Sequence, residues 1–85
     1  MTITLLSRAG CSACAVALAQ LQPICTEFEV ELSVIDIDAA AATDPELRAE
    51  YGDLIPVVLI DGAEHGYGEV DVPRLRADLT RRQGA

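Results

Sequence analysis

The stretch SRAGCSACAVAL, from Ser7 to Leu18, holds two cysteines three residues apart, between an apolar run and a segment with helical spacing. Thiols at this spacing support three kinds of chemistry: a dithiol–disulfide redox pair, half of a metal site, or a small structural disulfide. Which of these applies to Cys11 and Cys14 depends on the element that carries them and on the other ligands in the chain.

A helix that begins at Cys11 favours the redox pair. The apolar positions that recur at helical intervals after it are Cys14, Leu18, Leu21, Cys25 and Phe28. Residues i and i+3 of a helix lie about 5–6 Å apart, within disulfide reach. The free N–H groups and positive dipole at a helix N-terminus stabilise a thiolate at Cys11, and Cys14 on the apolar stripe is expected to be less exposed. We predict that Cys11 attacks a disulfide and Cys14 resolves the mixed disulfide. Arg8 could add positive charge there or could remain solvated at the surface.

A metal site is disfavoured, because zinc needs four ligands and only Cys25 and His65 remain among the cysteines and histidines. Cys25 shares a helix face with Cys14 but lies about 16 Å further along the axis. We therefore expect no metal, and we interpret Cys25 as a small buried core residue, with a peripheral redox or dimer-forming role as the alternative. His65 is interpreted as an exposed turn residue, with a general acid for the leaving thiol as the alternative.

Composition and charge narrow the class of protein. Residues 1–85 form one domain by length, with 51% hydrophobic residues, six arginines, no lysine and a formal net charge of −8. Such a surface repels phosphate backbones and anionic lipid, which argues against nucleic-acid and membrane partners. The first residues lack the pattern of a signal peptide, so we expect a cytoplasmic protein. Thiols are kept reduced there, which counts against a structural disulfide.

The periodicity predicts alternating strands and helices in the first half of the chain. Thr2–Leu6 is predicted as a buried strand, and roughly Cys11–Phe28 as one helix kinked at Pro23, with a break just before that proline as the alternative. Glu31–Asp38 is predicted as a second central strand, because its apolar residues are nearly consecutive. Residues 39–43 are a loop or a frayed helical start.

A second helix is predicted by agreeing end signals. Thr43 and Glu46 are spaced as a capping box, Pro45 suits the first turn, and Gly52 is a natural residue to end the helix.

The last third of the chain predicts a hairpin and a final helix. Val57–Ile60 forms the first strand, Asp61 and Gly62 the turn, and a shorter strand starts at Glu64. Asp71 is the expected N-cap of the final helix. The resulting order, β-α-β-α-β-β-α, predicts an α/β fold with a four-stranded mixed sheet and helices on both faces.

A proline begins one of these strands, in the run LIPVVLIDG. Taken alone, the Ile55–Pro56 bond is expected to be trans, since X–Pro bonds in folded proteins are mostly trans.

The whole succession resembles the thioredoxin superfamily and, more narrowly, the compact glutaredoxin-like proteins of bacteria. The resemblance covers Ile3 to Leu79: a strand, GCSAC opening a helix, then VIDID, YGDLIPVVLIDG, and a final hairpin and helix. Its specific part is a CxxC motif about forty residues before an apolar–Pro–apolar strand.

The resemblance implies roles for individual residues. Pro56 would be the cis-proline beside the CxxC, and the Ile55 backbone would pair with the substrate chain. Cys11 would match the nucleophilic cysteine, Cys14 the resolving cysteine, and Arg8 the basic residue before the motif.

The chain departs from typical glutaredoxins where they carry a Gly-Gly pair that cradles glutathione. Gly66 matches the first glycine, but Tyr67 stands in the place of the second. The tyrosine ring could block the tripeptide, or could shelter the disulfide and serve as a substrate platform.

We therefore predict a thiol–disulfide oxidoreductase that reduces disulfides of proteins or of low-molecular-weight thiols. It needs no organic cofactor or metal, since a reductase or a low-molecular-weight thiol such as glutathione supplies the electrons, and we expect a monomer. The alternatives are a redox-inactive or redox-sensing thioredoxin-fold binding module and an iron–sulfur or zinc carrier.

Overall fold

Eight helices and strands follow one another along residues 1–84, the part of the chain that this computed structural model describes. In chain order they are β1 (Thr2–Ser7), α1 (Ser12–Phe28), β2 (Glu31–Asp36), α2 (Ile37–Ala40), α3 (Pro45–Tyr51), β3 (Val57–Ile60), β4 (Ala63–Tyr67) and α4 (Val72–Gly84). The predicted order is confirmed, with the short helix α2 as an addition.

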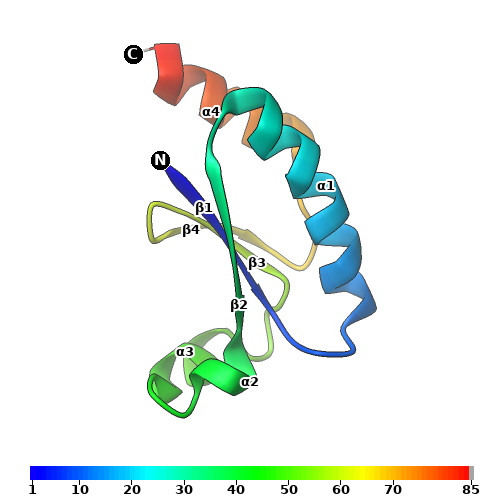
Figure 1. Cartoon of the computed structure of the whole chain (residues 1–85), viewed down its shortest axis with the longest axis vertical. Coiled ribbons are helices and arrows are strands. Elements are labelled where there is room, and N and C mark those ends of the chain that lie inside the picture. The colour runs from blue at the N-terminus through cyan, green and yellow to red at the C-terminus, as the bar shows by residue number, and fades with distance from the viewer. Residues whose placement is uncertain (85) are drawn as a thin grey trace.

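The four strands form one mixed sheet in the order β2-β1-β3-β4 (Figure 1). β1 runs parallel to β2 and antiparallel to β3, and β3 runs antiparallel to β4. The parallel pair is joined through α1, as a crossover connection requires. All four residues of β3 are buried, as expected for a central strand.

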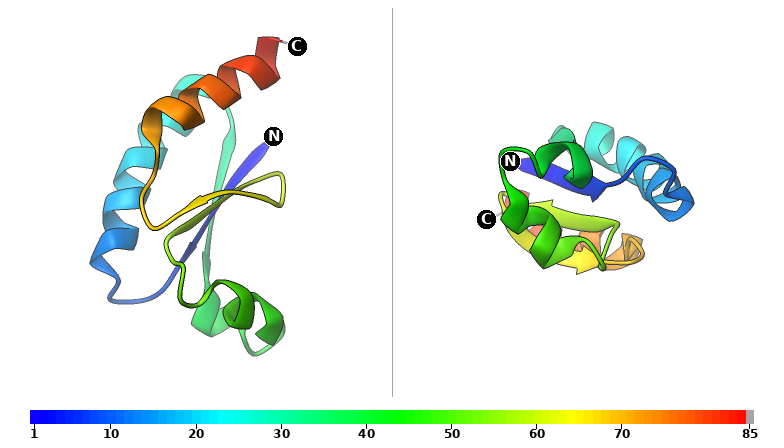
Figure 2. Two further views of the ribbon diagram at one scale, coloured as in Figure 1. Left: turned by 180° about the vertical axis from the view of Figure 1, so that it is seen from behind. Right: turned by 90° about the horizontal axis from the view of Figure 1, so that it is seen from below.

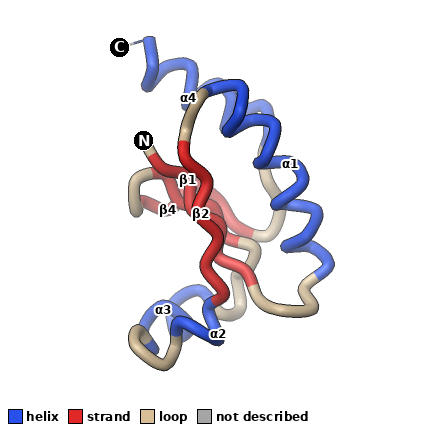
Figure 3. Tube along the Cα trace, in the orientation of Figure 1, coloured by secondary structure: helices blue, strands red, loops and turns tan. Residues whose placement is uncertain are grey.

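Helices cover both faces of the sheet, as predicted, but unequally. α1 and α4 pack side by side on one face (Figures 1 and 2). The buried residues of this larger core are Ile3, Leu5, Ala17, Leu21, Ile24, Cys25, Val58, Ile60, Leu75 and Leu79. α2 and α3 lie near the end of the sheet at which β2 finishes (Figure 3) and close a smaller cluster on the other face. The buried residues of that cluster are Leu6, Ile37, Val57 and Leu59.

α1 is one uninterrupted helix although it contains Pro23. Cys11 is its N-cap, in an extended conformation, and Glu29 ends it in the left-handed conformation. Pro23 removes one N–H from the helix, but Leu21 and Ile24 beside it are buried in the larger core, and this packing offsets the loss. The predicted single helix is confirmed, with Cys11 as its cap rather than its first residue.

The prediction that the second strand runs from Glu31 to Asp38 is wrong at its end. Oδ1 of Asp36 accepts hydrogen bonds from the backbone N–H groups of Asp38, at 2.9 Å, and Ala39, at 3.2 Å. Asp36 is thus the N-cap of α2 and the last residue of β2. The chain leaves the sheet here because the aspartate side chain replaces the strand's hydrogen bonds with those of a helix start.

The predicted capping box of Thr43 and Glu46 is also wrong by one residue. Asp44 is the N-cap of α3, and its Oδ1 accepts the N–H of Leu47 at 3.3 Å. The Thr43 hydroxyl instead donates to the carbonyl oxygen of Ala40. Thr43 therefore ends the preceding turn, and the neighbouring carboxylate is left to cap the helix.

The hairpin and the last helix follow the prediction closely. Asp61 and Gly62 have φ angles of 49° and 85°, the left-handed conformation that a two-residue hairpin turn needs. β4 begins at Ala63, one residue earlier than predicted. Oδ1 of Asp71 accepts the N–H of Arg74 at the start of α4, as expected of the cap. No helix within residues 1–84 is long and apolar enough to cross a membrane.

Candidate active site

Cys11 and Cys14 form a disulfide at the N-terminus of α1. Their Cα atoms lie 5.2 Å apart, within the range that a disulfide spans. The helix itself sets this separation, because positions i and i+3 lie on one face. The pair can therefore open and close without unfolding α1.

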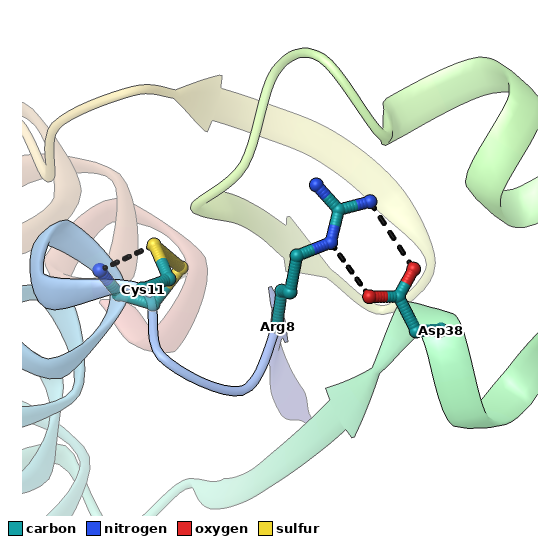
Figure 4. Close-up of a disulfide and its surroundings, with 4 residues drawn as sticks. Arg8, Cys11 and Asp38 are labelled. Carbon is teal, nitrogen blue, oxygen red and sulfur yellow. Dashed lines mark hydrogen bonds and ion pairs between the residues drawn. A yellow bond between two sulfur atoms is a disulfide. The ribbon is translucent and has the colours of Figure 1, made fainter.

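The two sulfur atoms have different surroundings. The backbone N–H of Cys14 donates a hydrogen bond to Sγ of Cys11 over 3.1 Å, where Cys11 caps the helix (Figure 4). Cys11 is half-buried, whereas only 4% of the surface of Cys14 is exposed. A sulfur that accepts an N–H at a helix start is stabilised as the anion. The helix start thus holds one partly exposed sulfur that accepts a backbone N–H and one buried sulfur.

The side chain of Arg8 is directed away from the disulfide (Figure 4). Its Nε and one terminal nitrogen donate to the carboxylate of Asp38, over 2.7 Å and 3.2 Å. Arg48 approaches the same carboxylate to 3.8 Å. The hydrogen bond from Arg8 is the main reason why the pKa of Asp38 lies below its usual value. The structure therefore pairs Arg8 with Asp38 rather than with Cys11.

Ile55 and Pro56 lie near the end of β1, where the loop that leads to Cys11 begins. The Ile55–Pro56 bond is cis, as the family resemblance implied, so the trans form expected from the bond alone is wrong. Leu6 pairs with Val57 across β1 and β3, which places Pro56 beside the end of β1. The residues from there to Cys11 form the loop before α1.

Gly68 is a site residue that sequence reasoning missed. Its backbone N–H donates to the carbonyl oxygens of Pro56, over 2.8 Å, and Leu54, over 3.2 Å. Its φ of 82° lies in the left-handed region that favours glycine. Within residues 1–84, no hydrogen bond uses the backbone N–H or carbonyl of Ile55, which lies between the two bonded carbonyls. The backbone of Ile55 is thus free to bind another chain.

Gly66 and Tyr67, which are neighbours on β4, have different surroundings. Gly66 lies inside β4, and the nearest atom to a Cβ built on it is Nη1 of Arg74 on α4, at 3.7 Å. Tyr67 is the last residue of β4, opposite Val57, and 59% of its surface is exposed. The glycine that approaches the start of β3 is therefore Gly68, and Tyr67 stands beside it.

Two surface hollows border the CxxC, on different faces of α1. The first, of about 330 Å³, lies between α1 and the loop after β4, and its lining residues are Ala13, Val16, Ala17, Gln20, Gly68, Glu69 and Val70. The second, of about 240 Å³, lies between α1 and the sheet, and its lining residues are Leu5, Ser7, Arg8, Gly10, Cys11, Cys14, Ala15, Leu18 and Val34. The first hollow is lined by Ala13 of the CxxC and by Gly68, which is hydrogen-bonded to the carbonyl oxygen of Pro56, whereas both cysteines line the second hollow.

Comparison with known sequences identifies the family. Residues 2–80 match the family described as Glutaredoxin-like domain (DUF836). The chain belongs to this family. Among its relatives are "Uncharacterized protein Rv0508" of Mycobacterium tuberculosis and "Uncharacterized protein Mb0520" of Mycobacterium bovis. Each is 51% identical over 80 residues, which cover 93% of this chain and 82% of the relative.

Solved structures resemble this glutaredoxin-like chain over nearly its whole length. The target protein XcR50 from X. campestris superposes with a TM-score of 0.66 at 28% identity, covering 93% of this chain and 96% of the other. Thioredoxin 1 from Thermosipho africanus superposes with a TM-score of 0.67 at 21% identity, covering 99% and 96%. The predicted thioredoxin-like fold is confirmed. Family, fold and the CxxC pair together indicate a redox-related function.

Cys25 of this glutaredoxin-like chain lies in the larger core, as predicted. Only 4% of its surface is exposed, and this burial raises the pKa of its thiol. The raised pKa disfavours the reactive thiolate form. Within residues 1–84, no three His, Cys, Asp or Glu side chains are grouped so that they could hold a metal ion.

The interpretation of His65 as an exposed turn residue is wrong. It lies on β4, with 9% of its side chain exposed, and its Nε2 is 2.6 Å from Oδ2 of Asp78 on α4. This contact is the main reason why the pKa of Asp78 lies below its usual value. The alternative role as a general acid is not supported, because the ring faces Asp78 and ties β4 to α4.

Proposed function

We propose that this protein is a thiol–disulfide oxidoreductase, with Cys11 as the nucleophile and Cys14 as the resolving cysteine. The observation that carries the proposal is the hydrogen bond from the Cys14 N–H to Sγ of Cys11 at the start of α1. In the reduced protein the same N–H meets the Cys11 thiolate and lowers the free energy of the charged form. Cys14 is buried, so an incoming disulfide reaches Cys11 first.

The reaction is a two-electron exchange in two steps. The Cys11 thiolate attacks one sulfur of the substrate, the substrate S–S bond breaks, and the other sulfur leaves as a thiolate that takes up a proton. Cys14 then gives up its proton, attacks Sγ of Cys11 in the mixed disulfide, and releases the second substrate thiol. The substrate disulfide becomes two thiols, while the protein dithiol becomes the Cys11–Cys14 disulfide present in the structure.

The segment before β3 offers a place for the substrate chain. The free N–H and carbonyl of Ile55 support pairing with an extended polypeptide, in the way a strand is added to a sheet. Pro56 is buried and cannot donate a hydrogen bond, so the half-buried Ile55 is the residue of this segment that an incoming chain would contact. Gly66 lies within β4 rather than beside this segment. Tyr67 and Gly68 are the residues that border the segment.

The cycle closes when a reductase or a low-molecular-weight thiol such as glutathione reduces the Cys11–Cys14 disulfide. The proposal requires neither an organic cofactor nor a metal, because the two sulfurs carry both electrons. It places the protein in the cytoplasm, where thiol reductants are maintained. It also treats the protein as a monomer, since both cysteines come from one chain.

Trapping of the mixed disulfide tests the proposal. The reduced Cys14→Ser variant, mixed with a peptide disulfide, should accumulate a covalent adduct at Cys11, which mass spectrometry locates. The matched Cys11→Ser variant should form none, because the buried Cys14 cannot attack first. Failure of Cys14→Ser to trap an adduct while Cys11 alkylates readily would show that the roles are wrong. A wild-type protein that reduces no disulfide would instead be a binding module.

A further inference from the structure

The first hollow beside the CxxC is mostly apolar and open to solvent. It lies between one face of α1 and the loop from β4 to α4, and Figure 2 shows that loop running beside α1. Ala13, inside the CxxC, forms one wall, and Gly68, bonded to the Pro56 segment, forms the opposite wall. Because Ala13 lies between the two cysteines, a substrate side chain in this hollow would lie next to the CxxC motif.

A large apolar side chain is exposed at this hollow. Val16 on α1 lines it and keeps 59% of its surface exposed, whereas Tyr67, with the same exposure, lines the neighbouring hollow on the other side of Glu69 and Val70. Within residues 1–84, the other large hydrophobic side chains with comparable exposure are Met1 and Val34. Covering Val16 with an apolar side chain of a partner would remove apolar surface from water, which favours binding.

The charge at the hollow is negative. Glu69 lines it with its side chain exposed, and no arginine within residues 1–84 does so. On the other side of the CxxC, Arg8 is bound to Asp38, and the carboxylates of Asp36 and Asp53 further raise the pKa of its guanidinium. No uncompensated cation therefore faces a substrate on either side of the motif.

Arg74 does not change this balance. It lies in a neighbouring hollow, where one terminal nitrogen donates to the carbonyl oxygen of His65. Glu64, Glu69 and Asp71 line that same hollow, so carboxylates outnumber the guanidinium. A substrate that carries carboxylates would meet repulsion here as well.

We propose that the preferred substrate is a polypeptide disulfide whose cysteine is flanked by an apolar side chain and by an arginine or lysine. The inference rests on the proposed function and adds its substrate class. The apolar side chain enters the hollow beside Val16, the cation faces Glu69, and the peptide backbone pairs with Ile55. Glutathione, a small tripeptide with two carboxylates, matches neither the apolar wall nor the charge. The electron transfer is unchanged: the peptide disulfide is reduced to two thiols as Cys11 and Cys14 are oxidised.

A set of matched substrates tests this inference. Short blocked peptides with Leu or Ser on one side of the cysteine, and Arg or Glu on the other, are made as symmetrical disulfides. Their reduction rates are compared with those of glutathione disulfide and a small uncharged disulfide. The Leu–Arg peptide should react fastest, exceeding the Leu–Glu peptide by about two- to fivefold at low salt, as expected for one exposed charge pair. High salt should shrink this ratio, because it screens exposed charges.

Two variants assign the charge effect. Glu69→Gln should bring the Arg-to-Glu rate ratio close to one, whereas Glu46→Gln on α3, which changes the net charge equally, should preserve it. Equal rates for all four peptides, or faster reduction of glutathione disulfide, would overturn the inference while leaving the oxidoreductase intact. Failure to reduce even the small uncharged disulfide would overturn the proposed function itself, and the inference with it.

Discussion

The guanidinium of Arg8 and the carboxylate of Asp38 form a two-point ion pair that joins the loop before α1 to the start of α2. Both side chains are partly exposed. Because the pair is neutral as a whole, its field at Cys11 is much weaker than that of an arginine alone. In the proposed reaction, stabilisation of the Cys11 thiolate is therefore assigned to the helix start rather than to a basic neighbour.

The Arg8–Asp38 ion pair predicts that removing either member shifts the pKa of the Cys11 thiol, in opposite directions. Arg8→Met leaves the Asp38 carboxylate with Arg48, at 3.8 Å, as its remaining partner and should raise the pKa of the Cys11 thiol, whereas Asp38→Asn frees the guanidinium of Arg8 and should lower it. Each shift should stay below about one pH unit, since salt screens exposed charges. The double variant should return close to the wild-type value. Alkylation rates measured against pH give these values, and a double variant that keeps the full Arg8→Met shift would contradict the pairing.

The contacts of Asp78 predict a pH-dependent stability. Hydrogen bonds with His65 and then Arg81 lower the pKa of Asp78 from its usual 3.8. A carboxyl with a lowered folded-state pKa contributes stability above its unfolded value and loses it as the pH falls through the folded value. Asp78→Asn should therefore lower Tm near neutral pH, and its difference from wild type should shrink below about pH 4.

Thermal unfolding near neutral pH and below about pH 4 measures the difference in Tm between Asp78→Asn and wild type. Glu46→Gln, which removes a carboxylate from α3, serves as the charge-matched control. A difference between Asp78→Asn and wild type that persists unchanged in acid would show that the ionised carboxylate is not what stabilises this contact.

The backbone conformation of Gly68 predicts a cost for any side chain there. At φ of 82°, Gly68→Ala should lower the free energy of unfolding by about 1–2 kcal/mol, because the left-handed region is unfavourable for residues with a Cβ. Gly66→Ala is the control, since its Cβ would make an ordinary contact at 3.7 Å with Arg74. Denaturant unfolding compares the two variants. Equal stabilities would show that the left-handed conformation at position 68 does not disfavour a residue with a Cβ.

The burial of Cys25 predicts that it stays protected in the folded protein. Its raised pKa and its place in the larger core should make its alkylation slow under native conditions and fast in denaturant. Cys25→Ala should leave the pH profile of Cys11 alkylation unchanged. Rapid native alkylation of Cys25, located by mass spectrometry, would contradict its burial.

Much of the fold could be predicted because its signals are local. The apolar stripe of α1 continues across Pro23, and the Asp61–Gly62 turn carries its own conformational preference. Boundaries were harder where one residue suits two structures. Asp36 fits the end of a strand as well as a helix cap, and only its hydrogen bonds to the following N–H groups decide between them. Thr43 and Asp44 are both good caps, and the sequence does not rank them.

The candidate site was predictable where spacing along the chain determines geometry. Cys11 and Cys14 meet because a helix brings residues three apart together. His65 was misplaced because its partner, Asp78, lies on another element thirteen residues away. Gly68 was missed for the same reason, since its role depends on two carbonyls before β3. Contacts between distant segments leave no periodic signal in the sequence.

The pH dependence of Cys11 alkylation in the reduced protein tests the central claim most directly. The rate at each cysteine is followed by mass spectrometry, so that Cys11, Cys14 and Cys25 are separated. The account predicts that Cys11 reacts fastest, with an apparent pKa well below the roughly 8.5 of an ordinary thiol. If all three cysteines react slowly, with values near or above about 8.5, Cys11 is not an activated nucleophile and the proposed catalysis is contradicted.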